Sequence, residues 1–192
     1  MIMDNIVPLL IGITGYRRSG KGVAADHLVQ HFGFTRFEWS MRLKLGLKEM
    51  GVPTAYLFGN RKEEIVPGFG KTARHLMQTL GTEWGRDLID QDLWVNLSCQ
   101  FDIDPTLRTG NPVVMEGTRF PNEVQAIKDR GGIIIQINRP GTAPDGHRSE
   151  ILPAFDYQIE NDGTTEELRQ KVGDLISSLM PESHPGLLSL CT

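Results

Sequence analysis

The feature that most constrains the fold is a short apolar run leading directly into a basic stretch rich in glycine. Residues 8–14 read PLLIGIT, and residues 15–22 read GYRRSGKG. A continuous apolar run of this length is typical of a strand buried on both faces of a sheet. Gly15, Gly20 and Lys21 then fit the pattern G-x-x-x-x-G-K, in which backbone amides wrap a phosphate and the lysine reaches the β- and γ-phosphates. The stretch therefore predicts a phosphate-binding loop between a strand and a helix.

Strand-like and helix-like segments alternate along the rest of the chain. Apolar or alternating patterns predict further strands at 34–39, 112–117, 133–138 and 155–160. Helical spacing predicts helices over 20–32, 40–50, 71–84, 90–101, 122–130 and 164–179, with a surface loop at 51–70. Thr164 and Glu167 fit a capping box at the last helix. The alternation predicts a three-layer α/β/α fold with a five-stranded parallel sheet, in which ligands bind at the carboxyl ends of the strands.

Composition restricts the classes of partner. The net charge of −4 provides no general attraction to nucleic acid or membranes, so an anion site must come from a local cluster. No apolar stretch approaches the length of a membrane span, and the N-terminal residues lack a basic leader. Cys99 and Cys191 fit two free thiols of a reducing compartment. We therefore expect a cytoplasmic protein without nucleic-acid or membrane partners.

The loop and the start of its helix are the candidate ATP site. The usual motif ends in a serine or threonine whose hydroxyl helps to hold Mg²⁺, but Gly22 stands at that position. The same GKG ending occurs in adenylate kinases, where waters and substrate phosphates can hold the ion. The manner of magnesium binding therefore stays open. The candidates for ATP binding are Gly15, Arg17, Arg18, Ser19, Gly20, Lys21, Gly22 and Val23.

The segment 71–84 contains a second candidate anion site. Arg74 and Gln78 lie four residues apart, so a helix would place them on one face, whereas Leu76 and Leu80 would face the core. A guanidinium fork suits a phosphate, and an amide suits the edge of a base. A solvated polar face would explain the same two residues without a ligand, and the spacing alone does not decide between the two interpretations.

Charged residues also follow the third and fourth predicted strands. Glu116 ends the third strand, where it could orient magnesium-bound water, accept a substrate proton, or act only as a cap or ion-pair partner. Arg119 lies just beyond it. Arg139 and Arg148 lie in the segment 139–153, where a closing flap would bring positive charge to a transferring phosphoryl group. A solvated loop with two basic residues is the alternative for that segment.

Several stretches together resemble one family. They are LFGNRKE, ARHLMQTLGTEWGRD, DLWV, EGTRFPNEVQAIKDRGGIIIQINRPG, HRSE and IENDGTTEEL. Over roughly residues 8–179 the chain resembles the phage-type deoxynucleoside monophosphate kinases. The resemblance implies transfer of the γ-phosphoryl group from ATP, with Mg²⁺, to a deoxynucleoside monophosphate (dNMP) in deoxynucleotide biosynthesis for DNA replication. It implies a single nucleoside monophosphate kinase-like domain over 1–192, with a helical acceptor-binding region at about 40–103, a lid at about 139–153 and a flexible tail at 181–192.

The resemblance also implies roles for single residues. Lys44 resembles the start of the family's monophosphate site. Glu116 stands beside Gly117, where the family often has an aspartate, and becomes the candidate to hold magnesium, directly or through water. The implied acceptor-binding residues are Lys44, Arg74, Gln78, Glu116, Arg139, Ser149, Glu150, Asn161 and Asp162. The implied catalytic residues are Lys21, Arg119, Arg139 and Arg148.

The sequence is also compatible with other functions. The chain could be a P-loop kinase of another acceptor, similar to dephospho-coenzyme A kinase, or a nucleotide-binding regulator. Dimers are common in the resembling family, and the 90–101 helix is a candidate contact surface, although a monomer is also compatible with the sequence. If a phage encodes the chain, the expected compartment is the host cytoplasm. The bases accepted and the choice between deoxyribose and ribose are not readable from these residues.

Overall fold

The sheet carries the fold, and its strands are those that the sequence predicts. The computed structural model describes residues 9–143 and 152–179. It contains the strands β1 (Leu10–Thr14), β2 (Thr35–Glu38), β3 (Val113–Glu116), β4 (Ile133–Asn138) and β5 (Tyr157–Glu160). Their order is β2-β3-β1-β4-β5, and every pair is parallel. The predicted five-stranded parallel sheet is confirmed, with β1 at its centre.

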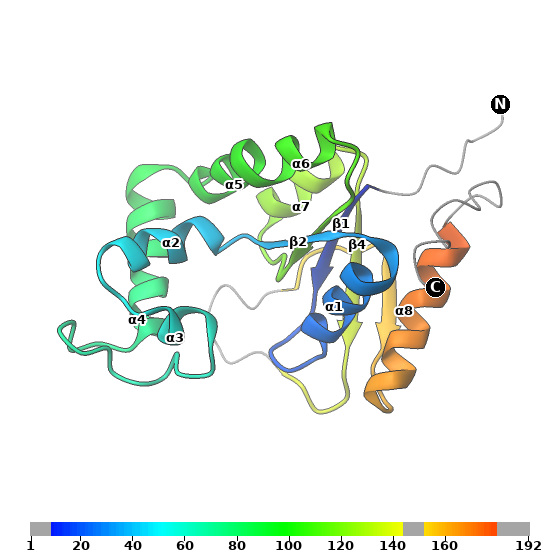
Figure 1. The fold of residues 1–192 in the computed structure, drawn as a ribbon, viewed down its shortest axis with the longest axis horizontal. Coiled ribbons are helices and arrows are strands. Elements are labelled where there is room, and N and C mark those ends of the chain that lie inside the picture. The colour runs from blue at the N-terminus through cyan, green and yellow to red at the C-terminus, as the bar shows by residue number, and fades with distance from the viewer. Residues whose placement is uncertain (1–8, 144–151, 180–192) are drawn as a thin grey trace. The chain divides into compact units, whose positions relative to one another are not determined.

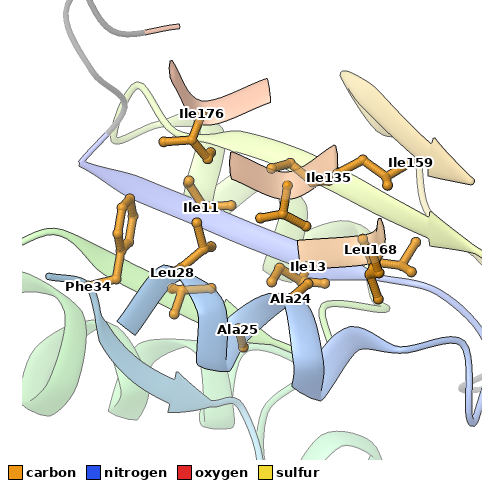
Figure 2. Close-up of a cluster of buried hydrophobic side chains, with 13 residues drawn as sticks. Ile11, Ile13, Ala24, Ala25, Leu28, Phe34, Ile135, Ile159, Leu168 and Ile176 are labelled. Carbon is orange, nitrogen blue, oxygen red and sulfur yellow. The ribbon is translucent and has the colours of Figure 1, made fainter. Parts of the chain in front are cut away.

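Two helices cover one face of this sheet and a third covers the other. Helices α1 (Lys21–Phe32) and α8 (Thr165–Leu179) pack against each other over the face that carries Ile11 and Ile13 (Figures 1 and 2). Helix α7 (Pro121–Lys128) packs on the opposite face against β1 and β4. A Cβ atom at Gly12 would lie only 2.6 Å from the Ile127 Cδ1 atom of this helix, so the strand approaches α7 closely. The three layers follow from strands that are apolar on both faces.

The ends of α1 and α8 show the local chemistry that fixes helix boundaries. Gly20 precedes α1 with φ 105°, and Gly33 ends it with φ 70°, a conformation that glycine adopts without a Cβ penalty. Before α8, the Thr164 amide donates to the Glu167 carboxylate at 2.6 Å, and the Glu167 amide donates to the Thr164 hydroxyl at 3.2 Å. The predicted capping box is therefore confirmed.

Residue contacts divide the chain into two compact units. One comprises Trp39–Asp102, and the other comprises the described parts of Met1–Glu38 and Ile103–Thr192. The first unit contains α2 (Met41–Glu49), α3 (Thr54–Phe58), α4 (Ala73–Gln78), the π-helix η1 (Thr79–Ile89) and α5 (Leu93–Ser98). A second π-helix, η2 (Cys99–Ile103), runs up to the boundary, and α6 (Asp104–Arg108) follows it in the sheet unit.

The helical unit departs from the sequence prediction in two places. The predicted surface loop at 51–70 is wrong in part, because it contains α3 and buries Tyr56, Leu57 and Val66 in an apolar cluster. The predicted helix over 71–84 is an α-helix only as far as Gln78. In both places packing within the unit outweighs the glycine, proline and periodicity signals of the local sequence.

Two buried glycines of the π-helix η1, Gly81 and Gly85, lie against the side chain of a tryptophan. Trp94 of α5 is buried, and its indole N–H donates to the Gly81 carbonyl at 2.7 Å. A Cβ atom at Gly85 would lie 2.5 Å from the same indole nitrogen. The two glycines therefore let the indole approach the helix backbone. Across the described part of the chain, no helix combines the length and apolar character needed to cross a membrane.

Candidate active site

The loop between β1 and α1 is closed by its own lysine. Lys21 is 9% exposed, and its Nζ atom donates to the Gly15 carbonyl at 2.8 Å and to the Tyr16 carbonyl at 2.6 Å. Gly15 has φ 143°, and a Cβ atom there would overlap the Ile137 carbonyl oxygen of β4. The loop thus needs glycine at this position both for its conformation and for its approach to the sheet. The structure brings the predicted loop residues together at the carboxyl end of the central strand.

A residue from the far edge of the sheet supports the same loop. Asn161 directly follows β5, is 6% exposed, and donates from Nδ2 to the Ser19 carbonyl at 2.8 Å. A Cβ atom at Gly20 would lie 2.6 Å from this amide nitrogen. The sequence resemblance implies a role for Asn161 in acceptor binding, and the structure shows its side-chain amide on the loop backbone. Asp162 is exposed and pairs with Lys171, whose hydrogen bond holds the pKa of the Asp162 carboxyl below its usual value.

Two buried hydroxyls lie at this end of β1. The Oγ1 atom of Thr14 and the Oγ atom of Ser19 are buried, and neither has a hydrogen-bond partner among the described residues. Arg17 and Arg18 are exposed on the loop, and Arg18 has φ 64°, an uncommon conformation for a residue with a side chain. Val23 packs against the apolar cluster beneath α1. The loop therefore combines unsatisfied polar atoms, exposed positive charge and an apolar base.

Glu116 ends β3 beside the start of α1, in contact with an arginine that sequence reasoning missed. Arg36 of β2 forms ion pairs with Glu116 through Nη2 and with Asp26 of α1 through Nη1. A Cβ atom at Gly22 would lie 3.7 Å from both Glu116 Oε1 and Arg36 Nη2. The alternation of β2 could have indicated that Arg36 and Glu38 share a face, but only the parallel register places this face beside Glu116.

The remaining basic candidates of the sheet unit lie at strand ends. Arg119 is partly buried, and its backbone amide donates to the carboxylate of Glu123, which caps helix α7, at 2.8 Å. Arg139 is exposed immediately after β4. The predicted lid residues Arg148, Ser149 and Glu150 lie outside the described residues, as does the tail from 181. Glu116 therefore ends β3, and Arg119, Arg139 and Asn161 follow the carboxyl ends of β3, β4 and β5 in turn.

Two acceptor candidates of the helical unit, Lys44 and Arg74, contact different partners. Lys44 of α2 is 4% exposed, and its Nζ atom lies 5.1 Å from the centre of the Phe58 ring. Arg74 of α4 forms an ion pair with Glu63, with 2.6 Å between Nε and Oε1. Gln78 ends α4 and is partly buried. Sequence reasoning missed Glu63, and only its position in the quoted LFGNRKE stretch could have drawn attention to it.

Comparison with known proteins identifies the family. A family model described as deoxynucleotide monophosphate kinase matches residues 60–172. A protein of Acanthamoeba polyphaga mimivirus, provisionally named deoxynucleotide monophosphate kinase, is 33% identical over 181 residues, which cover 85% of this chain and 94% of the viral protein. The chain belongs to the deoxynucleotide monophosphate kinase family. It is therefore an enzyme of the phosphotransferase class, and the resemblance found in the sequence is confirmed.

More distant comparisons agree with this assignment. The deoxynucleotide monophosphate kinase of Enterobacteria phage T4 is 32% identical over 112 residues, which cover 56% of this chain and 46% of the phage enzyme. The match therefore spans a little under half of that enzyme. The structure of dephospho-CoA kinase from Campylobacter jejuni covers 89% of this chain and 96% of its own, with a TM-score of 0.51 and 10% identity. This likeness shows a shared fold and carries no information about the acceptor.

Proposed function

We propose that the chain transfers the γ-phosphoryl group of ATP to a deoxynucleoside monophosphate, giving the diphosphate and ADP for DNA synthesis. The observation that carries the proposal is a closed phosphate-binding loop, with Lys21 on its own carbonyls, in a chain whose family is named for this reaction. ATP-dependent phosphoryl transfer is general for such kinases. The identity of the acceptor is our proposal.

At the donor end, we propose that the loop amides and Lys21 hold the β- and γ-phosphates. The helix N-terminus and consecutive amides supply positive potential without any bulky side chain. When ATP binds, its phosphate oxygens replace the Gly15 and Tyr16 carbonyls as partners of the Lys21 ammonium. Arg17 and Arg18 add positive charge on the exposed side of the loop. Such fixed donors stabilise the charge of a phosphoryl group during transfer.

At the acceptor end, we propose that Arg74 binds the phosphate of the monophosphate and Gln78 binds its base. The two residues are four apart in α4, a spacing that places them on one face of a helix. The buried side chain of Lys44 supplies a second positive charge. Arg74 exchanges its Glu63 partner for the substrate phosphate. The nucleophile is an ionised phosphate oxygen, so transfer requires positioning and charge neutralisation but no strong general base.

Magnesium fits the acidic residue at the end of β3. Mg²⁺ commonly keeps several waters and binds through one or two carboxylates together with substrate phosphates. Glu116 is partly exposed, and its Oε1 atom faces the space above Gly22 that the usual hydroxyl would occupy. When bound, the ion neutralises charge on the donor phosphates. We therefore propose Glu116 as its protein ligand, directly or through water.

The remaining proposals follow from the family. Arg119 and Arg139 lie at strand ends where they can reach the transferring group, and Arg148, Ser149 and Glu150 complete a lid over 139–153. The compact unit Trp39–Asp102 supplies the acceptor region, predicted at about 40–103, of a single kinase domain over 1–192. Asp162 contributes to nucleotide binding beside Asn161. A homodimer through the segment 90–101 and a cytoplasmic reaction complete the proposal.

A substrate panel tests the proposal directly. ADP release from ATP and Mg²⁺ is measured separately with dAMP, dGMP, dCMP, dTMP and the matching ribonucleotides. We expect turnover with at least one deoxynucleotide and weaker turnover with its ribose form. Turnover with dephospho-coenzyme A but with none of the nucleotides would contradict the proposed acceptor while leaving the kinase class intact.

A further inference from the structure

The chain lacks the hydroxyl that usually follows the phosphate-loop lysine, and a charged trio stands beside the empty position. Gly22 is part of α1, and the nearest atoms to a Cβ placed there are Glu116 Oε1 and Arg36 Nη2, both at 3.7 Å. These are ordinary van der Waals distances, so a side chain could begin at this position in contact with both charged groups. One of the two groups is the carboxylate that we propose as the magnesium ligand.

The two oxygens of that carboxylate have different surroundings. Arg36 Nη2 contacts Oε2 of Glu116, whereas Oε1 faces the space above Gly22. Arg36 is held in turn by α1, because the carboxylate of Asp26 on this helix contacts the Arg36 Nη1 atom. A planar guanidinium that engages two carboxylates in this way fixes their orientation, which an ammonium cannot do. The trio of one guanidinium and two carboxylates keeps a net negative charge, as a cation site requires.

From this geometry we propose that Arg36 is a positioning residue for magnesium binding. It holds Glu116 by one oxygen so that the other faces the position where the usual hydroxyl would stand. The proposal rests on the proposed function above and deepens it, because it explains how a loop ending in Gly22 can bind the ion. Partners that orient metal ligands typically change metal affinity by about 10–100-fold when they are removed.

The test measures metal binding rather than turnover. Mn²⁺ is titrated into the protein saturated with a non-hydrolysable ATP analogue, and bound Mn²⁺ is quantified by electron paramagnetic resonance. We expect Arg36→Gln to weaken Mn²⁺ binding by about 10–100-fold. The matched control is Arg169→Gln, which removes another partly exposed, ion-paired arginine of the same unit, with side-chain exposure of 42% against 35% for Arg36. The control is expected to leave Mn²⁺ affinity unchanged.

A second substitution locates the effect. Gly22→Ser places a hydroxyl beside Glu116, at the position where the usual motif has one, and in the Arg36→Gln background it is expected to recover most of the lost affinity. Arg36→Lys, which keeps the charge but loses the fork, is expected to show an intermediate loss and replaces Arg36→Gln if that variant does not fold. Affinity equal to or tighter than that of the unmodified protein in the Arg36 variants would overturn the proposal. Loss without recovery by Gly22→Ser would overturn the assignment of the role to this position.

The experiment separates the two proposals. If the unmodified protein binds Mn²⁺ with the ATP analogue and shows the expected variant pattern, but phosphorylates no deoxynucleotide, the acceptor assignment fails and the role of Arg36 stands. If turnover with deoxynucleotides is present and Arg36→Gln binds Mn²⁺ normally, the role of Arg36 fails and the proposed function stands.

Discussion

The donor loop and the helical unit Trp39–Asp102 hold their candidate residues in different ways. In the loop, backbone atoms fix the key groups: Lys21 donates to the Gly15 and Tyr16 carbonyls, and Asn161 donates to the Ser19 carbonyl. In the helical unit, side chains fix the candidates, with an aromatic ring beside Lys44 and a carboxylate on Arg74. Lys21 has to leave only neutral carbonyls when a phosphate binds, whereas Arg74 has to release a charged carboxylate first. The predictions below test this difference.

The largest effect is expected at Lys21. Lys21→Ala removes the ammonium that we expect on the β- and γ-phosphates, and turnover should fall by at least about 10²–10³-fold, the loss typical of a preorganised charge-stabilising donor. Steady-state kinetics with ATP and the accepted dNMP measures the change. Lys21 also ties the loop together, so thermal unfolding must show that the variant is folded at the assay temperature. A folded variant with unchanged turnover would contradict the assignment of the donor loop.

How far a feature could be predicted from the sequence depends on whether it is local or joins distant segments. The donor loop could be identified because its chemistry lies within eight consecutive residues, and the strands could be identified because burial on both faces gives continuous apolar runs. Arg36 could not be found in this way, because its contact with Glu116 depends on the register between β2 and β3. Glu63 lies in a stretch whose glycine and proline signals predict only a loop. Contacts set by register or by packing between distant segments are not visible in local patterns.

In the helical unit, the packing of the π-helix is expected to control stability. Gly85→Ala places a methyl group against the Trp94 indole, 2.5 Å from its nitrogen, and overpacking of this kind costs about 1–3 kcal/mol. The matched control is Gly46→Ala in α2, where no atom lies within 4 Å of the new Cβ. Because alanine is the better helix former, the control should stabilise the protein by about 0.5–1 kcal/mol.

Chemical denaturation monitored by tryptophan fluorescence gives both free energies of unfolding. Equal changes for the two glycine variants would show that the close approach of the indole to η1 does not constrain this helix. A destabilised Gly85→Ala variant that keeps its affinity for ATP would sharpen the comparison, because it would separate the stability of the helical unit from the donor loop.

A smaller effect is expected from the counter-ion of Arg74. Glu63→Gln removes the carboxylate that competes with the acceptor phosphate, so the KM for the dNMP should fall while the KM for ATP stays the same. Exposed ion pairs contribute about 0.2–1 kcal/mol, which limits the decrease to roughly fivefold. The control is the neighbouring substitution Glu64→Gln, because Glu64 pairs with Arg61 instead. An equal decrease in both variants would indicate a general charge effect and would remove the evidence for partner exchange at Arg74.

The smallest effect is expected in the pH dependence of stability, through His27 of α1. Burial lowers the pKa of His27 below its usual value, and the nearby His31 of α1 and Arg169 of α8 lower it further, against an opposing contribution from Glu166. The unfolded chain, with a histidine pKa of about 6.5, therefore binds a proton at a higher pH than the folded protein does. Stability should be independent of this group above that pH and should decrease as pH falls below it. His27→Gln should remove this part of the acid dependence in thermal unfolding between about pH 7 and 5.

If the unfolding temperature of the variant depends on pH as that of the unmodified protein does, the acid sensitivity comes from another group. If only the unmodified protein becomes more stable on acidification, the sign expected for His27 is wrong. Because α1 begins at the donor loop, ATP affinity measured over the same pH range would show whether protonation of His27 also affects phosphate binding by the loop.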